Sequence, residues 1–375
     1  MNENVKKVKG HLSFSDVFED ATKHCRKIPA SNYLESGIYQ IIDQGQNNIA
    51  GYTNDSIDLY TDTPVIIFGD HTRVVKYIDK PFFIGADGVK VLKPKTNELN
   101  TKYLYYVLSN AKIPNTGYNR HFKWLKEIKI PVFSFSMQEE IVSLLNKIET
   151  IIDKRKQQLE NLDKLIKSQF IEMFGEIGSD KNGWGIRPLA DCCDVNPKKG
   201  EDARIRKGME VSFVPMQSVS EQGDIDTTAV RTYEEVQKGF TYFSEGDVLF
   251  AKITPCMENG KGAIARGLKN SVGFGSTEFH VLRPKAEVCN SEWIYAITSF
   301  PQFRQDAARK MTGSAGQRRV PASFLASYMV SCPPIELQEQ FADFVEQTDK
   351  SKFTIKQSLE QLEILKKSLM QKYFG

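Results

Sequence analysis

The sequence predicts two mixed α/β domains, each followed by a long helix, with the two helices packed against each other. Two repeats support this fold. Residues 137–175 and 337–375 align without a gap at an offset of 200, and 12 of the 39 aligned positions are identical, including Gln138/Gln338 and Phe174/Phe374. Residues 85–108 and 275–298 form a second repeat, with Asn100 aligned to Asn290. A repeat of this length indicates one structural unit that occurs twice.

Both long segments have the apolar spacing of a coiled-coil helix. The first copy has apolar residues every seven positions, at Leu145, Ile152, Leu159, Ile166 and Met173. The second copy keeps the same register but has lysine at two of these positions, Lys352 and Lys366. Each helix would be about 57 Å long at 1.5 Å per residue. The obvious partner of each helix is the other copy, although two amphipathic helices could instead pack separately on their own domains.

The chain ends each long segment with Phe-Gly, and glycine can close a helix in the left-handed conformation. Before each long helix, the shorter repeat predicts a strand, a Pro-Lys turn and an amphipathic helix. Further strands are expected at 64–68, 74–78 and 89–92 in the first domain, and at 247–253 and 279–282 in the second. We therefore expect a first domain at 1–132, a helix at 133–175, a second domain at 176–332 and a helix at 333–375.

The composition excludes several classes of protein. A net charge of +3 is too small for a general polycation. The six cysteines and five histidines lack metal-ligand spacing, which favours free thiols in a reducing cytosol. The first residues do not have the pattern of a signal peptide, and no apolar run is long enough to span a membrane. We expect a cytoplasmic protein without contact to a membrane.

Catalytic motifs are absent from the sequence. The segment NGKG (259–262) lacks the upstream glycine and the hydroxyl of a nucleotide-binding P-loop, and GFGS (273–276) lacks the third glycine of a dinucleotide site. The loop that holds the target amine in amino-methyltransferases, the hydrolase elbow and the zinc protease motif are also missing. Together these absences favour a non-catalytic binding or scaffold protein that binds no cofactor of its own.

Basic residues gather in loops of both domains, near matching positions. Arginine and lysine neutralise phosphates or pair with guanine, whereas His, Asn, Thr and Ser can contact other base edges. The DNA-binding candidates of the first domain are His71, Thr72, Arg73, Lys76, Tyr77, Arg120, His121 and Lys123. Those of the second domain are Lys252, Thr254, Lys261, Arg266, Gln317, Arg318 and Arg319. Each of these loops could also be an ordinary solvated turn.

Taken together, these motifs resemble the specificity subunit of type I restriction–modification systems over essentially the whole chain. In the second half the resemblance rests on GDVLFAKITPCMENGKGA (246–263), FGSTEFHVLRP (274–284), TGSAGQRRVP (312–321) and PPIELQEQ (333–340). In the first half it rests on FGDHTRVVKYIDKPFFIGADGVKVL (68–92). The segment IPVFSFSMQEE (130–140) is the counterpart of PPIELQEQ, with Phe133-Ser134 in place of Pro-Pro.

The resemblance implies two target-recognition domains that each contact one half of a split, asymmetric sequence in double-stranded DNA. The two long helices would pack antiparallel as a fixed spacer. It also implies assembly with two methyltransferase subunits and two restriction subunits, which are translocases and nucleases. S-adenosylmethionine, ATP and Mg would then belong to those partner subunits.

The exposed faces of the long helices are candidates for partner binding, with Lys156, Lys356, Lys167 and Lys367 as the residues expected to take part. An ordinary solvated helix face would have the same composition. Two other functions also fit the sequence: a coiled-coil scaffold that does not recognise DNA, and the specificity part of a combined restriction–methylation polypeptide.

Overall fold

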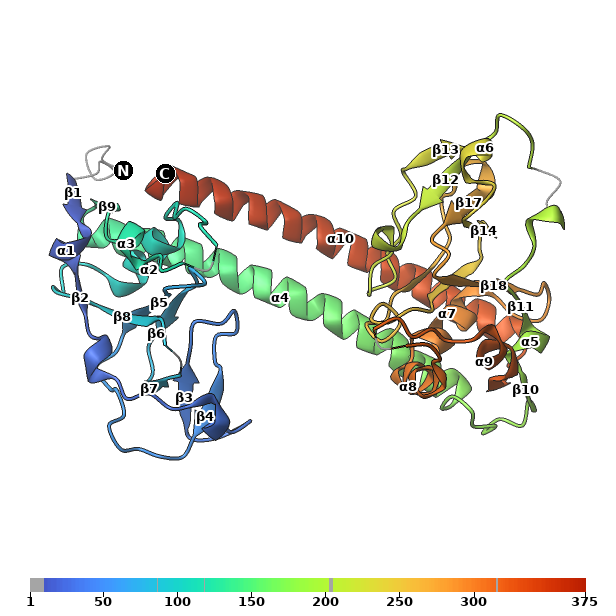
Figure 1. Cartoon of the computed structure of the whole chain (residues 1–375), viewed down its shortest axis with the longest axis horizontal. Helices are drawn as coiled ribbons and strands as arrows, with labels where there is room; N and C mark the ends of the chain where they lie inside the picture. Colours follow the sequence, from blue (N-terminus) through green and yellow to red (C-terminus); the bar gives the residue numbers. More distant parts are fainter. Residues whose placement is uncertain (1–9, 86, 118, 202–204, 315) are drawn as a thin grey trace. The chain divides into compact units, whose positions relative to one another are not determined.

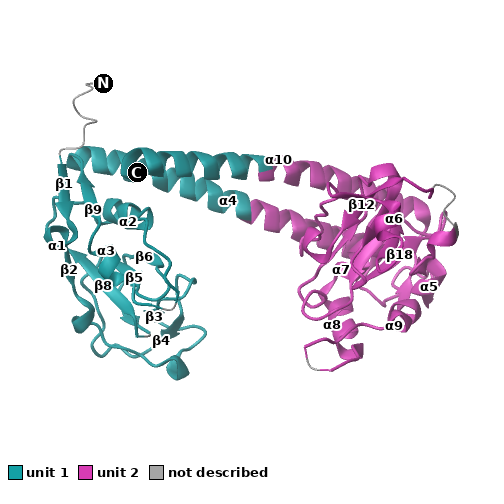
Figure 2. Cartoon of the chain, turned by 45° about the horizontal axis from the view of Figure 1, so that its top comes forward, with its two compact units in different colours: residues 1–156, 357–375 teal, residues 157–356 magenta. Residues whose placement is uncertain are grey.

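The computed structural model describes residues 10–85, 87–117, 119–201, 205–314 and 316–375 (Figure 1). The chain divides into two compact units (Figure 2). Unit 1 comprises residues 1–156 and 357–375, and unit 2 comprises residues 157–356. The division lies within both long helices, α4 (Phe135–Phe174) and α10 (Ile335–Phe374), so each unit contains part of each helix.

Unit 1 contains a four-stranded sheet of order β2-β8-β5-β6 and a three-stranded sheet of order β4-β3-β7. The strands are β2 (Phe18–Asp20), β3 (Tyr39–Ile42), β4 (Gly51–Thr53), β5 (Val65–Gly69), β6 (Val75–Ile78), β7 (Phe82–Ile84) and β8 (Val89–Pro94). Strands β3 and β7 are parallel, and the other neighbours in these sheets are antiparallel. The remaining elements are the antiparallel pair β1 (Gly10–Ser13) and β9 (Lys129–Val132), and the helices α1 (Phe14–Val17), α2 (Thr101–Ser109) and α3 (Phe122–Leu125).

Unit 2 contains two four-stranded sheets, of order β11-β18-β15-β16 and β13-β12-β17-β14. The strands are β11 (Cys193–Val195), β12 (Glu210–Val214), β13 (Val230–Thr232), β14 (Thr241–Ser244), β15 (Val248–Ala251), β16 (Gly262–Ile264), β17 (Val272–Gly275) and β18 (Phe279–Pro284). A further pair is formed by β10 (Ile186–Pro188) and β19 (Met329–Ser331). The short helices are α5 (Leu189–Cys192), α6 (Tyr233–Val236), α7 (Ser291–Ser299), α8 (Pro301–Lys310) and α9 (Ala322–Ser327).

The two units share one topology, to which unit 2 adds strand β14 beside β17. The order β2-β8-β5-β6 corresponds to β11-β18-β15-β16, and the parallel pair β3–β7 corresponds to the parallel pair β12–β17. Equivalent elements begin at residues 14 and 189 (α1, α5), 65 and 248 (β5, β15), 89 and 279 (β8, β18), and 135 and 335 (α4, α10). The offset grows from 175 at α5 to 200 at α10, so the additional residues are spread along the whole of unit 2. The duplication therefore covers the whole unit, and the strands expected from the sequence are confirmed.

A buried glutamine in the first turns of each long helix joins that helix to its own domain. Gln338 is fully buried; its Oε1 accepts a hydrogen bond from the backbone N–H of Asn290 at 3.1 Å. Its Nε2 donates to the carbonyls of Val288 (3.0 Å) and Pro333 (2.8 Å). In unit 1, Gln138 makes the same bond to the N–H of Asn100 at 2.9 Å. Both asparagines cap a helix, α2 or α7, so each long helix is fixed to a capped helix of its domain.

The C-terminal part of one long helix packs against the domain of the other repeat. In unit 1, the Phe374 ring of α10 lies 5.6 Å from that of Tyr103 in α2. In unit 2, the Phe174 ring of α4 lies 5.5 Å from that of Phe341, near the start of α10. Within each unit the two helices therefore run antiparallel. The antiparallel packing implied by the resemblance is confirmed, and the alternative of separately packed helices is wrong.

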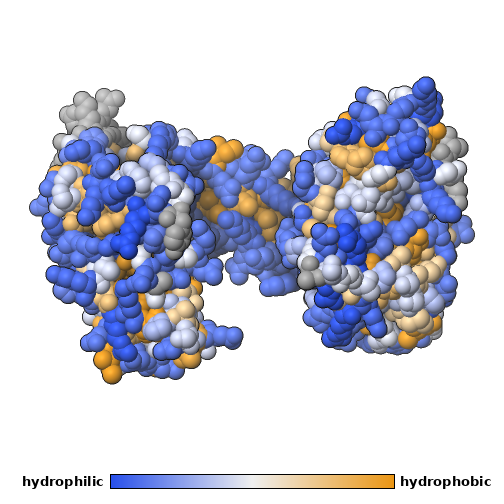
Figure 3. Space-filling model, viewed as in Figure 1, coloured by the Kyte–Doolittle hydropathy of each residue, from blue (hydrophilic) through white to orange (hydrophobic). Residues whose placement is uncertain are grey.

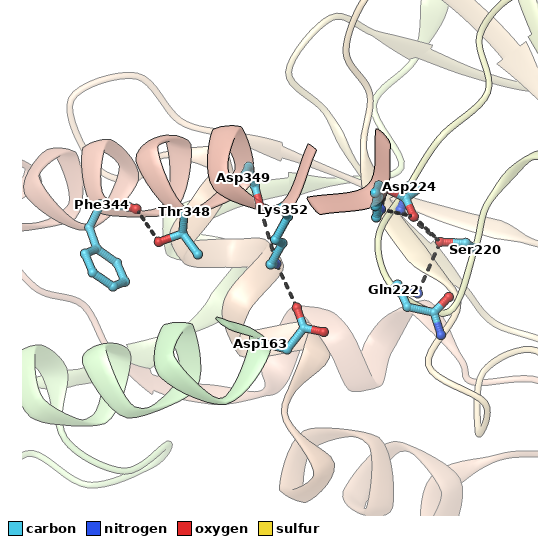
Figure 4. A network of polar contacts seen from close by, with 9 residues as sticks. Asp163, Ser220, Gln222, Asp224, Phe344, Thr348, Asp349 and Lys352 are labelled. Carbon is cyan, nitrogen blue, oxygen red and sulfur yellow. Dashed lines mark hydrogen bonds and ion pairs between the residues drawn. The ribbon is translucent and has the colours of Figure 1, made fainter. Parts of the chain in front are cut away.

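The two lysines in the apolar seam of the second helix have acidic partners on the first. Lys352 Nζ lies 2.7 Å from a carboxylate oxygen of Asp163 in unit 2 (Figure 4). Lys366 Nζ lies 2.8 Å from a carboxylate oxygen of Glu149 in unit 1. Because both pairs are partly exposed, they contribute modestly to stability, but they favour the antiparallel register. The expected helix end is also present, since Gly175 has a φ of +83° after the last residue of α4.

In the described part of the chain, no helix combines the length and the hydropathy that a membrane crossing requires.

We predict that Gln338→Ala destabilises unit 2, because the substitution leaves the partly buried N–H of Asn290 and two carbonyls without their partner. The expected loss is about 2–4 kcal/mol, since each buried unsatisfied group costs about 1–3 kcal/mol. Thermal unfolding of the full chain measures the effect. The control is Gln340→Ala, which changes an exposed glutamine of the same helix. Equal unfolding temperatures for the two variants would contradict the role of the buried amide.

Candidate nucleic-acid interface

Three loops of unit 1 meet at the same end of its two sheets. Loop 43–48 follows β3, loop 70–73 connects β5 to β6, and loop 85–88, of which residue 86 is not described, connects β7 to β8. The loops after β3 and β7 lie side by side because these strands are parallel and pair Ile42 with Ile84. The pairing of Gly69 with Val89 brings loop 70–73 to the same end. We call these loops, together with segment 119–123, the first loop surface.

Gln44 connects the three loops through its side chain and backbone. Its side-chain Oε1 accepts from the N–H of His71 (3.2 Å), its carbonyl accepts from Thr72 Oγ1 (2.6 Å), and its Nε2 donates to the carbonyl of Asp87 (2.9 Å). The packing needs glycine at position 88, where φ is +84° and a Cβ would lie 2.8 Å from the His71 ring. The loops therefore form one continuous surface with defined backbone positions.

Asp70 joins segment 119–123 to this surface. Its carbonyl accepts from the backbone N–H of His121 (2.8 Å) and lies 2.9 Å from His121 Nδ1. Its carboxylate accepts from the N–H of Phe122 (2.7 Å). His121 is completely buried, so the structure assigns it to holding the segment and not to direct DNA contact. The neighbouring residues Arg120 and Lys123 are exposed beside loop 70–73.

Lys76 and Tyr77 do not face outward with the other candidates. Lys76 is only 4% exposed, and its Nζ donates to the carbonyls of Asp43 (2.8 Å) and Asn47. Burial lowers the pKa of Lys76, and the nearby Asp43 carboxylate opposes this shift. Tyr77 points to the other face of β6, where its ring lies 6.1 Å from that of Tyr105 in α2. Lys76 therefore anchors loop 43–48, and Tyr77 belongs to the packing of α2.

In unit 2, backbone pairing brings together most of the residues predicted from the sequence. The N–H of Thr254 donates to the carbonyl of Arg318 (3.0 Å), and the N–H of Val320 donates to the carbonyl of Lys252 (2.9 Å). Loop 252–261, which follows β15, thus lies against segment 312–320, in which residue 315 is not described. We call these two segments the second loop surface. It contains Lys252, Thr254, Lys261, Gln317, Arg318 and Arg319.

The two arginines of the second loop surface already have partners within the chain. Arg319 forms a two-point ion pair with Glu278, at 2.9 and 2.8 Å, and this hydrogen bonding lowers the pKa of the Glu278 carboxyl. Arg318 donates to the carbonyls of Ala308 and Met311 at the end of α8. Gln317 is exposed, and no side-chain hydrogen bond holds it in the described residues. The arginines therefore have fixed positions, whereas the Gln317 amide is accessible to a ligand.

A buried arginine supports the second loop surface from inside the unit. Arg304 of α8 is 7% exposed and donates to the carbonyls of Met257 (3.1 Å), Lys261 (3.2 Å) and Gly260 (3.2 Å). Its Nε donates to the carbonyl of Thr298 at 2.6 Å. The sequence around Arg304 is basic and does not distinguish it from a surface arginine. Its burial in the structure shows that it supports the loop from inside the unit.

Arg266 lies away from the second loop surface, although the sequence grouped it with those residues. It follows the far end of β16, whereas Lys261 precedes the near end of that strand. Its guanidinium pairs with Glu292 in the first turn of α7. Lys261 and Arg266 are close in the sequence, but they therefore lie at opposite ends of β16 in the structure.

The lysines expected at a partner interface are all exposed on the long helices. Lys156 Nζ lies 3.9 Å from Glu363 in unit 1, while Lys356 donates to both carboxylate oxygens of Asp224 in unit 2 (2.7 and 2.9 Å). Lys356 therefore also links α10 to a loop of its own unit. Hydrophobic residues are exposed on the long helices as well (Figure 3). They include the equivalent Leu165 and Leu365, which are 46% and 47% exposed.

The loop surfaces combine cations, hydroxyls and side-chain amides. Exposed Arg and Lys can neutralise phosphates, and Thr, Gln and His can contact base edges. Among the residues that the structure describes, no group of three or more His, Cys, Asp or Glu side chains could hold a metal ion. The chemistry available on these surfaces is recognition of a polyanion with hydrogen-bonding edges.

A family model for the "Type I restriction modification DNA specificity domain" matches residues 10–162 and 181–364. Among curated proteins, the chain is 38% identical over 162 residues to the specificity subunit of the type I restriction enzyme EcoAI from Escherichia coli, over 42% of this chain and 27% of that protein. It is 41% identical over 155 residues to the EcoEI specificity subunit of the same organism, over 40% of this chain and 25% of that protein. The matches thus span about a quarter of these relatives.

Two solved structures are similar over nearly the whole chain. The S subunit of a type I restriction–modification system from M. genitalium has a TM-score of 0.57 at 17% identity, and covers 100% of this chain and 98% of its own. The second is a chain from a study of complex assembly and conformational transition of the type I R-M system. Its TM-score is 0.55 at 15% identity, and the match covers 98% of both chains. At these identities the likeness shows the fold.

We predict that Arg304→Met loosens loop 252–261, because three loop carbonyls lose their buried donor. Trypsin should cleave after Lys261 about tenfold faster or more, since cleavage requires local opening of the loop. The matched control is Arg309→Met in the same helix, where the arginine is exposed and pairs with Asp306. Equal cleavage rates in the two variants would show that Arg304 does not hold the loop.

Proposed function

Because the chain belongs to the type I restriction–modification DNA specificity family, we propose that it selects the DNA sequence on which a type I restriction–modification complex acts. The observation that carries this proposal is the duplication. The two units share one topology apart from β14, and each has a loop surface at the same end of its corresponding sheet, β2-β8-β5-β6 or β11-β18-β15-β16. The residues on the two loop surfaces differ, as expected of two modules that recognise different sequences.

The target is bipartite and asymmetric in this proposal. One loop surface contacts one half-site in double-stranded DNA, and the other contacts a second half-site of different sequence. The long helices act as a spacer between the two half-sites. Each has 40 residues, about 60 Å at 1.5 Å per residue, which corresponds to about 18 base pairs as an upper bound on the separation.

The side chains on the loop surfaces have two kinds of task. Arg73, Arg120 and Lys123 in unit 1, and Lys252 in unit 2, neutralise phosphates. His71, Thr72, Thr254 and Gln317 contact base edges, because their donors and acceptors suit groove recognition. Arg318 and Arg319 set the position of the second loop surface and contact DNA only where their existing bonds leave donors available.

The chain acts in the cytoplasm as a non-catalytic subunit. It binds two methyltransferase subunits and two restriction subunits, which hold S-adenosylmethionine, ATP and magnesium. The similar exposure of Leu165 and Leu365 supports a pseudo-symmetric partner surface on the long helices. Lys156, Lys167 and Lys367 lie on the same helices and contribute charge there, while Lys356 is partly engaged with Asp224.

A reconstitution experiment tests the proposal. The full chain is combined with its methyltransferase partner, and modified adenines are mapped by sequencing on a library of random DNA. We expect a single split motif that appears only when the chain is present. Replacing the globular part of unit 2 with that of another specificity protein should change one half of the motif and preserve the other. Modification that is unchanged by this exchange would contradict the proposal.

A further inference from the structure

We propose that loop 43–48 of unit 1 is a base-recognition loop whose side-chain amides, at Gln46, Asn47 and Asn48, contact base edges in the DNA major groove, adenine above all. This inference rests on the proposed function and deepens it, since it names the residues that determine one half of the target. The loop was not among the candidates drawn from the sequence because it carries no basic residue.

The backbone of this loop is held at three points. Lys76 Nζ donates to the carbonyls of Asp43 and Asn47, at the two ends of the turn. Gln44 binds loop 70–73 and loop 85–88, as described above. The Asp43 carboxylate accepts from the N–H of Gly45 at 2.8 Å. The loop therefore adopts its conformation before any ligand binds, which reduces the entropic cost of binding.

The side chains at the tip of the loop are exposed. Gln46, Asn47 and Asn48 are all solvent-exposed, and in the described part of the chain no hydrogen bond engages their side-chain amides. Three consecutive amides thus offer paired donors and acceptors in the loop whose Gln44 binds His71 and Thr72. An Asn or Gln amide can bond simultaneously to N6 and N7 of adenine.

The burial of Lys76 indicates that the conformation of loop 43–48 has a function. Burying an ammonium group is costly, and an apolar side chain would serve the interior better. Lys76 has backbone carbonyls as its hydrogen-bond partners, with the Asp43 carboxylate at 3.5 Å. Through these bonds, Lys76 fixes the conformation of loop 43–48.

Unit 2 repeats the arrangement with a different sequence. Lys261, directly before β16, donates to the carbonyl of Met216 at 3.3 Å, in the segment that follows β12. Strands β6 and β16 are equivalent, as are β3 and β12. The residue after Met216 is Gln217, an exposed amide. A lysine that fixes an amide-bearing turn is therefore present in both units although their loops have diverged.

The experiment uses the full chain reconstituted with its methyltransferase partner. For the wild type and the variants Gln46→Ala, Asn47→Ala and Asn48→Ala, the modified motif is mapped on a random DNA library and binding is measured against salt. The matched control is Asn97→Ala, an exposed amide beyond the opposite end of β8. Lys76→Met tests the positioning residue, with Lys76→Arg as the conservative variant.

We expect at least one amide variant to lose about 5- to 150-fold discrimination at defined positions of one half-site. The other half-site and the slope of binding against salt should stay unchanged, because amides neutralise no phosphate. Lys76→Met should weaken discrimination at the same positions, and Lys76→Arg should restore part of it. Asn97→Ala should behave as the wild type.

Two results overturn the inference while leaving the proposed function intact. One is a wild-type chain that directs a split motif which none of the three amide variants changes. The other is a variant that weakens binding equally on all sequences, which would assign the loop to backbone contact. A wild-type chain that directs no sequence-specific modification would overturn the proposed function, and this inference with it.

Discussion

The fold depends on one reciprocal contact: the aromatic end of each long helix packs against the domain of the other repeat. Phe374 meets Tyr103 in unit 1, and Phe174 meets Phe341 in unit 2. Neither repeat is therefore complete without the other, which explains why both copies keep the same terminal Phe-Gly. The antiparallel direction of the helices follows from this exchange, and the ion pairs of Lys352 and Lys366 agree with it.

The loop surfaces are connected to the long helices through a short series of contacts. A buried glutamine of the helix bonds the capping asparagine of α2 or α7, and these helices pack on the sheet that carries the loops. The loops are fixed in turn by buried polar groups, Asp70 and Lys76 in unit 1 and Arg304 in unit 2. In the proposed function, this arrangement lets the loop sequences change while the loop positions remain constant.

The sequence predicted the helices and the central strands because their signals are periodic and occur twice. It also aligned Gln138 with Gln338 and Asn100 with Asn290, but it could not show that these residues bond to each other. The binding surfaces were harder to predict because a count of charges does not reveal burial. The basic pattern included Lys76 and His121, which are buried, and Arg266, which lies at the other end of β16. It could not include the exposed amides of loop 43–48, at Gln46, Asn47 and Asn48, because they carry no charge.

The central claim is that the paired helices set the distance between two recognised half-sites. The direct test is a variant with seven residues inserted into each helix, between Lys156 and Gln157 and between Lys356 and Gln357. The measurement is the motif that the reconstituted complex modifies. One heptad preserves the helix seam and adds about 10 Å, or about 3 base pairs. The account predicts a gap that is longer by this amount between two unchanged half-sites. An unchanged gap in an active, folded variant would contradict it.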